Sequence, residues 1–188
     1  MLIFTEMKAK VLSEKIEIPE GIEVSLDKNL LKIKGQKGEV HKNFTFLKTE
    51  LKKENNTLHF TVHGVGRKSK DFLNSSISHF HNMVKGAKEN YVYKLKVCSG
   101  HFPMNVVVEK NKVIIKNFLG EKVARIANIL ENVDVKVNGD IIVVESVDKE
   151  KAGQVSANIE MATKIPNKDR RVFQDGVFII EKAGEPVK

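Results

Sequence analysis

The sequence contains few cysteines, prolines and aromatic residues, and it has no tryptophan. Its single cysteine, Cys98, excludes an internal disulfide and a zinc site built from several thiolates, so we expect a small apolar residue in or near a strand. No run of about 18 apolar residues occurs, and the start, MLIFTEMKAK, lacks a cleavage-like site. We therefore expect neither a transmembrane helix nor a signal peptide, and a cytoplasmic location.

Arginine is also scarce, with four residues against 28 lysines. The net charge is nevertheless +8, which favours a polyanionic partner, either nucleic acid or an anionic membrane surface. Residues 1–100 carry 18 Lys and Arg against 11 Asp and Glu, whereas residues 101–188 carry 14 against 13. If the second half binds a polyanion, it must do so through local clusters of charge.

Apolar residues alternate with polar ones in several short segments between residues 11 and 62, a pattern typical of antiparallel strands with one wet face. A helical pattern follows, with Ser69 or Asp71 as its N-cap and Gly86 at its end. Its apolar residues share one helix face: Leu73, Ile77, Phe80 and Val84. We expect this helix to pack on the sheet.

The same order of segments occurs a second time. Asp27-Lys28-Asn29 aligns with Glu109-Lys110-Asn111, and Gly38 aligns with Gly120, both at a lag of 82 residues. TLHFTV matches DIIVVE, and the first helix matches a second at about residues 148–163. The second helix has its own apolar stripe: Ala152, Val155, Ile159 and Ala162. We predict an α+β protein with two duplicated domains, residues 1–88 and 89–188, each an antiparallel β-sheet packed against one α-helix.

The histidines and acids form no recognisable catalytic or metal site. His79 and His81 are two residues apart on a helix and cannot share a ligand, while His59 and His63 share a strand face with no acid or cysteine next to them in sequence. No Ser-His-Asp set, nucleophile elbow or paired carboxylates stand out. We expect no enzymatic activity, no cofactor and no metal.

Cations are concentrated in the segment KIPNKDRRVFQDGVF, residues 164–178, which lies between Pro166 and the turn pair Asp175-Gly176. Two of the four arginines are adjacent there, and the planar arginine fork suits phosphates and guanine edges. Its candidate nucleic-acid contacts are Lys164, Lys168, Arg170 and Arg171. Phe173 can stack on a base or pack under its own domain, and packing is the favoured interpretation. A solvated terminal loop is the alternative for the whole segment.

Two further basic clusters are weaker candidates. The glycine turn at Gly64 leads into Arg67, Lys68 and Lys70, where a helix start can bind a phosphate or can simply be solvated. The spacing there matches neither a Walker loop nor a dinucleotide fingerprint.

The other cluster surrounds Asn117-Phe118-Leu119-Gly120 and consists of Lys116, Lys122 and Arg125. A structural loop is the safer interpretation for that cluster.

Five further blocks occur in the chain: Asn82-Met83-Val84-Lys85-Gly86, YVYKLKV from Tyr91, His101-Phe102-Pro103-Met104, Asn117 to Lys122, and DRRVFQDGVF from Asp169. These blocks resemble the universal large-subunit ribosomal protein family six, in its archaeal and eukaryotic branch. The resemblance implies two duplicated α+β domains, no enzymatic activity, and binding to large-subunit rRNA.

The resemblance also implies a position near the sarcin-ricin loop and stalk base, beside neighbouring ribosomal proteins and close to translation factors. We therefore interpret the protein as a structural constituent of the large ribosomal subunit that supports translation. A free-standing nucleic-acid-binding regulator is the alternative. A phosphate-processing enzyme that uses residues 64–70 is the third hypothesis.

Overall fold

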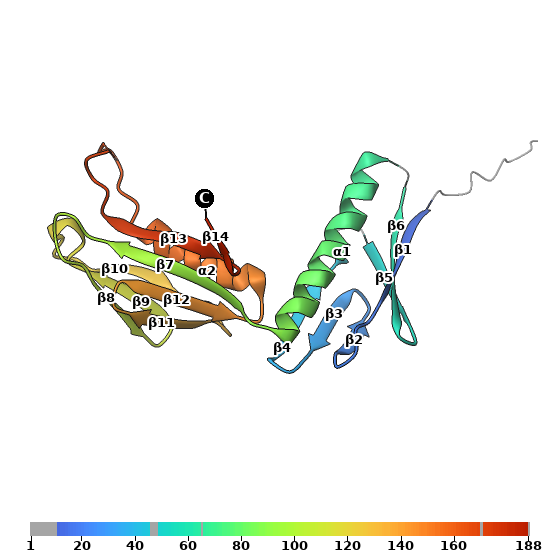
Figure 1. Cartoon of the computed structure of the whole chain (residues 1–188). Coiled ribbons are helices and arrows are strands. Elements are labelled where there is room, and N and C mark those ends of the chain that lie inside the picture. Colours follow the sequence, from blue (N-terminus) through green and yellow to red (C-terminus); the bar gives the residue numbers. More distant parts are fainter. Residues whose placement is uncertain (1–10, 46–48, 65, 170, 188) are drawn as a thin grey trace, which may run out of the picture. The chain divides into compact units, whose positions relative to one another are not determined.

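The computed structural model describes residues 11–45, 49–64, 66–169 and 171–187. The chain divides into two compact units, Met1–Lys88 and Glu89–Lys188 (Figure 1). In each unit a long helix packs on antiparallel strands, which confirms the predicted duplicated α+β fold class. In detail, the strands of each unit form two separate sheets rather than one.

Unit 1 contains two three-stranded sheets, ordered β1-β6-β5 and β2-β3-β4, and the helix α1. Its elements are β1 (Val11–Glu17), β2 (Glu23–Asp27), β3 (Leu30–Lys34), β4 (Glu39–Asn43), β5 (Thr49–Glu54), β6 (Thr57–His63) and α1 (Arg67–Lys88). The rings of Phe44, Phe60 and Phe80 meet edge to face at the centre of its core, with centroids 6.2 Å and 5.8 Å apart. All three rings are buried, so the alternation in β6 and the stripe on α1 converge on one core.

Unit 2 contains a three-stranded sheet, β10-β9-β8, and a five-stranded sheet, β11-β12-β7-β13-β14. Its elements are β7 (Tyr91–Cys98), β8 (Asn105–Glu109), β9 (Lys112–Lys116), the 3-10 helix η2 (Phe118–Gly120), β10 (Arg125–Asn128), β11 (Asp134–Asn138), β12 (Ile141–Ser146), α2 (Lys149–Ala162), β13 (Gly176–Lys182) and β14 (Glu185–Pro186). Helix α2 contacts strands of both sheets. Leu95, Ile115 and Ile159 are fully buried where they meet.

The two units share a topology, and the second unit adds to it. The order β5-β6-β1 in unit 1 corresponds to β11-β12-β7 in unit 2. Lys28 and Lys110, which the 82-residue repeat aligns, both have positive φ, 54° and 49°. In unit 2, β13 pairs antiparallel with the other edge of β7 and continues into β14. The added hairpin lies directly after the cation-rich segment, so it fixes one end of that segment to the sheet.

Three local predictions were wrong. Helix α1 begins at Arg67 and not at a cap on Ser69 or Asp71, so the three cations lie in its first turn. It also continues through Gly86 to Lys88, where the Lys37 N–H donates to the Ala87 carbonyl at 3.2 Å. Similarly, Asp175 and Gly176 form no hairpin turn, because β13 begins at Gly176 and Asp175 is buried.

Candidate nucleic-acid interface

The cationic loop, residues 164–175, leaves the end of α2 and is anchored there by Thr163. The Thr163 hydroxyl donates to the Glu160 carbonyl at 3.0 Å and accepts from the Val177 N–H at 2.9 Å. Thr163 is buried, so these bonds join the end of α2 to the start of β13 in a position shielded from water. The Thr163 side chain therefore joins the two ends of the loop at its base.

The other end of the cationic loop is held by Asp175, which is only 3% exposed. Asp175 Oδ1 accepts from the backbone N–H groups of Gly100 at 2.6 Å and His101 at 2.9 Å. Its Oδ2 lies 2.5 Å from His101 Nδ1, which must be the donor because an ionised carboxylate only accepts. Burial alone raises the pKa of Asp175, but the hydrogen bonds from His101 and Gly100 outweigh it and lower the pKa.

Between these anchors the described cations of the loop face solvent. Lys164, Lys168 and Arg171 are exposed, and the Arg171 side chain is 90% exposed. The Arg171 guanidinium donates to both oxygens of Asp169, with the shortest bond at 2.8 Å, which lowers the pKa of that carboxyl. Arg170 lies outside the described residues.

Phe173 connects the loop to the β7–β8 connection through its ring. The ring stacks on His101, with centroids 5.1 Å apart and planes inclined by 19°, and the Lys168 ammonium lies 4.3 Å from its centroid. Phe173 is half-buried. It is therefore intermediate between the two roles expected from the sequence, since it packs against its own unit but keeps part of its surface in water.

The cluster at residues 116–125 contains one arginine that is fixed by the protein. Arg125 donates through Nε and Nη2 to the Glu121 carboxylate at 2.8 Å and 2.6 Å, and through Nη1 to the carbonyls of Ala162 and Lys164, each at 3.0 Å. Its guanidinium carbon also lies 4.3 Å from the centroid of the buried Phe118 ring. The hydrogen bond from Arg125 lowers the pKa of Glu121, against the opposing effect of burial.

Arg125 thus joins β10 to the end of α2 and supports the base of the cationic loop. This geometry favours a structural role for Arg125, as the sequence suggested for its cluster. Lys116 and Lys122 are exposed beside η2 and remain available to a ligand.

The third cluster lies at the start of α1, in unit 1. Its first turn contains Arg67, Lys68 and Lys70, and all three face solvent. No acidic residue is present in that turn. Positive side chains at the positive end of a helix dipole are mutually unfavourable, and an external anion relieves this repulsion. Gly64, with φ 113°, precedes the helix, whereas Val65 lies outside the described residues.

The histidines have partners that their sequence neighbours did not reveal. His63 Nε2 lies 3.0 Å from a Glu50 oxygen and His59 Nε2 lies 3.3 Å from a Glu54 oxygen, both across strands. In the described ranges, no three His, Cys, Asp or Glu side chains form a group that could hold a metal ion. No helix within those ranges is long and apolar enough to cross a membrane.

Sequence reasoning missed His101 and Asp175 as the anchor of the loop. They are 74 residues apart, and the Asp-Gly pair has the same local signature as a turn. His101 belongs to the block HFPM, but nothing in that block indicates its partner. The pairing becomes visible only when β13 is placed beside β7.

Comparisons with known proteins agree with the observed architecture. The family model for ribosomal protein L6 matches residues 18–90 and 102–176, one segment in each unit. The large ribosomal subunit protein uL6 of Sulfurisphaera tokodaii is 45% identical over 177 residues, which cover 94% of this chain and 95% of that protein.

Proteins of the same name from two other organisms are also similar. The Aeropyrum pernix protein is 43% identical over 170 residues, covering 90% of this chain and 93% of its own length. The Methanobrevibacter smithii protein is 38% identical over 174 residues, covering 93% and 98%.

Proposed function

Since the chain belongs to the ribosomal protein L6 family, we propose that it is a structural constituent of the large ribosomal subunit and binds large-subunit rRNA. Its relatives are named as large-subunit proteins, and they match this chain along nearly its whole length. The proposed activity is binding, with translation as the process it supports and the cytoplasmic ribosome as its location.

The observation that carries the proposal is the cationic loop, whose exposed cations sit on a rigid base. Lys164, Lys168 and Arg171 extend into solvent, while Thr163 and Asp175 fix the backbone on either side of them. A phosphate ligand gains more from cations that are already positioned, because less conformational entropy is lost on binding. We include Arg170 in this interface from its place in the sequence.

The cations at the start of α1 supply a second proposed RNA contact in the other unit. Arg67, Lys68 and Lys70 combine exposed charge with the positive end of a helix. Two linked units that contact different RNA elements raise the effective concentration for the second contact. Lys122 completes the proposed interface in unit 2, and Arg125 positions the loop there.

We further propose that the protein lies near the sarcin-ricin loop and stalk base, next to other ribosomal proteins and close to where translation factors dock. The support for this placement is the resemblance of the sequence blocks in both units to the family. A crosslinking map of the protein on its own ribosome tests it directly. Crosslinks confined to rRNA remote from those elements would contradict the placement.

Charge removal in the cationic loop tests the RNA interface. Replacing Arg170 and Arg171 with glutamine should weaken binding to large-subunit rRNA and flatten its salt dependence, by about 0.7–0.9 in slope for each phosphate that is no longer neutralised. Lys110→Gln with Lys112→Gln is the matched control, since it removes the same charge from exposed positions in the β8–β9 turn and at the start of β9. An unchanged salt slope in the arginine variant would remove the pair from the interface.

Asp169 gives a test in the opposite direction. Asp169→Asn removes the carboxylate that binds the Arg171 guanidinium, so the variant should bind rRNA more tightly than the wild type at low salt.

Sedimentation separates the proposed function from that of a free-standing regulator. The ribosomal protein should travel with large subunits through moderate salt, whereas a regulator would stay near the top of the gradient.

A further inference from the structure

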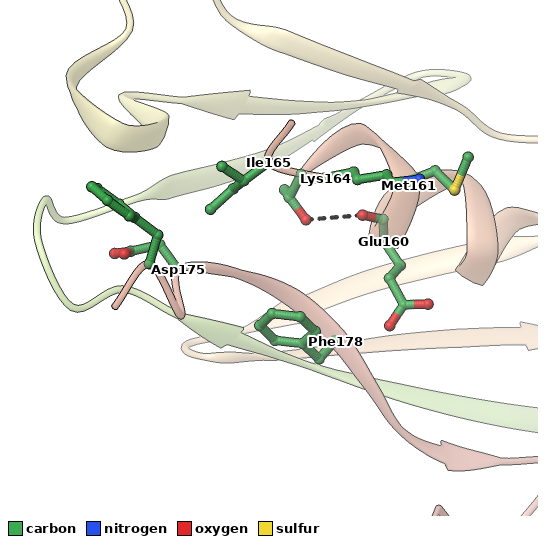
Figure 2. Close-up of a pocket in the computed structure, with 8 residues that line it drawn as sticks. Glu160, Met161, Lys164, Ile165, Asp175 and Phe178 are labelled. Atoms are coloured by element: carbon green, nitrogen blue, oxygen red, sulfur yellow. Dashed lines mark hydrogen bonds between the residues drawn. The ribbon is translucent and has the colours of Figure 1, made fainter. Parts of the chain in front are cut away.

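A pocket of about 290 Å³ lies beside the cationic loop, between the end of α2 and the start of β13 (Figure 2). Glu160, Met161 and Lys164 line it at the end of α2, Phe173 lines it from the later part of the loop, and Phe178 lines it from β13. Its volume is close to the lower limit of small-ligand sites, about 300 Å³. A pocket of this size suits one small ring system rather than a folded peptide or a whole nucleotide chain.

The walls of the pocket are apolar and partly aromatic. Ile165 and Phe178 lie on opposite sides of it, and both are half-buried (Figure 2). Met161 reaches its rim and is 65% exposed, an unusual position for a large apolar side chain on a surface this rich in cations. Flat apolar walls next to phosphate-binding cations are the combination found where proteins stack unpaired bases.

Two polar groups at one end of the pocket provide hydrogen-bonding capacity of opposite kinds. The Glu160 carboxylate is fixed by the Ile179 N–H, which donates to Oε1 at 3.2 Å, and a carboxylate retains further acceptor sites on both oxygens. Lys164 supplies only donors. The Thr163 hydroxyl already donates to the Glu160 carbonyl and accepts from Val177, so it adds no free donor.

A base edge with an amino donor beside a ring-nitrogen acceptor complements the Glu160 carboxylate and the Lys164 ammonium. Adenine and cytosine carry that arrangement on their Watson–Crick edges, and a carboxylate accepts well from the cytosine amino group. In uracil the corresponding exocyclic group is an acceptor, so uracil places a carbonyl oxygen where the carboxylate requires a donor. Lys168 and Arg171, from the same loop, are available for the phosphates of the nucleotide whose base enters.

We propose that this pocket receives one unpaired RNA base, adenine or cytosine, whose ring packs between Phe178 and Ile165 and whose amino group donates to Glu160. The inference rests on the proposed rRNA-binding function and makes it more specific. It adds a base-reading site to an interface of phosphate contacts. Phosphate contacts carry no sequence information, whereas a base pocket does.

The test uses the full chain and four single-stranded RNA hexamers: A6, C6, U6 and an abasic ribose-phosphate hexamer. Methyl NMR of Met161 and Ile165 reports on the pocket, because an inserted base shifts methyl signals by its ring current. We expect both signals to move with A6 and C6 but not with the abasic hexamer. The abasic hexamer should bind roughly 5- to 150-fold more weakly than A6, the range expected for one stacked base.

Two variants separate stacking from hydrogen bonding. Phe178→Leu keeps an apolar side chain but removes the flat ring, and it should reduce the advantage of A6 over the abasic hexamer. Glu160→Gln keeps the size of the side chain and should reduce the preference for A6 and C6 over U6. Glu131→Gln, at an exposed loop position of unit 2, is the matched control and should change neither.

Equal binding of A6 and the abasic hexamer, with unmoved Met161 and Ile165 signals, would overturn the pocket proposal. In that case, salt-dependent binding of all four hexamers and incorporation into large subunits would leave the rRNA-binding function standing. Methyl shifts that are the same with U6 as with A6 would refute the assigned role of Glu160. If the chain bound neither rRNA nor any hexamer, both the pocket and the proposed function would be wrong.

Discussion

Replacing Asp175 with alanine should release the end of the cationic loop from the β7–β8 connection. The carboxylate accepts three hydrogen bonds, from the N–H groups of Gly100 and His101 and from His101 Nδ1. Hydrogen bonds to ionised groups contribute about 1.5–3 kcal/mol each. Gly100 and His101 are exposed, so water replaces part of this bonding, and we expect the unfolding free energy of unit 2 to fall by about 2–4 kcal/mol.

Asp175→Asn should destabilise unit 2 less than Asp175→Ala does. The amide keeps an oxygen for the two backbone donors but removes the charge that faces His101, so the destabilisation should be about 1–2 kcal/mol. Asp134→Asn is the control, because Asp134 is an exposed carboxylate on the far edge strand, β11, of the same sheet. Its unfolding free energy should match that of the wild type.

The effect of Asp175 should depend on pH in one direction. Its native pKa is lowered below the ordinary value of 3.8, so the native state binds this proton more weakly than the unfolded state does. The contribution of Asp175 to the unfolding free energy is therefore complete above its pKa in the unfolded state. It is lost as the pH falls through its pKa in the native state. The difference in unfolding free energy between wild type and Asp175→Ala should therefore shrink as the pH falls below about 4.

Tyrosine fluorescence measures the unfolding free energy of unit 2 in the intact protein. The chain has no tryptophan and two tyrosines, Tyr91 and Tyr93, and both lie on β7 in unit 2. Denaturant titrations followed at the tyrosine emission therefore report the unfolding of unit 2. An alanine variant as stable as Asp134→Asn, or a gap equally large at pH 3 and pH 7, would refute the reasoning.

Two other substitutions test the remaining structural claims. Arg125→Ala should destabilise unit 2 by about 2–4 kcal/mol, and Arg125→Lys should recover little, because an ammonium cannot reproduce the forked contacts to Glu121 and to the carbonyls at the end of α2. Recovery by lysine in the tyrosine-fluorescence titration would count against the geometry. Gly35→Ala should destabilise unit 1 by about 1–3 kcal/mol, since its Cβ would come too close to the Ala87 carbonyl oxygen. Circular dichroism should show this as earlier loss of helix, with the tyrosine transition unchanged, and a stable variant would contradict the close approach.

Much of the fold could be predicted from local patterns. The alternation in β3 and β6 placed Leu31, Ile33 and Phe60 inside, and all three are buried. The repeat at a lag of 82 residues aligned Lys28 with Lys110, and both adopt positive φ. These predictions succeeded because strand and helix periodicity arises from the geometry of a few adjacent residues.

The boundaries of α1 could not be predicted in the same way. Ser69 has the local preference of a cap because serine accepts from the backbone at helix starts, but the helix already includes Arg67. At the other end, Gly86 indicated a stop, yet it is buried inside the helix, and the Lys37 N–H bonds to the next residue. At this second end, the hydrogen bond from Lys37 in the β3–β4 connection accompanies the continuation of the helix past Gly86, against local preference.

The sequence by itself determined that the chain is duplicated, that its units are α+β, and that its cations gather in three short stretches. It favoured a structural loop around Arg125 but could not identify the partners of either arginine. Arg125 and Arg171 both belong to such stretches, yet Arg125 is fixed among Glu121, Phe118 and the end of α2, whereas Arg171 extends into solvent. Only the tertiary structure decided this, because the partners of a side chain come from segments that are distant in the chain, and their approach depends on how the sheets pack.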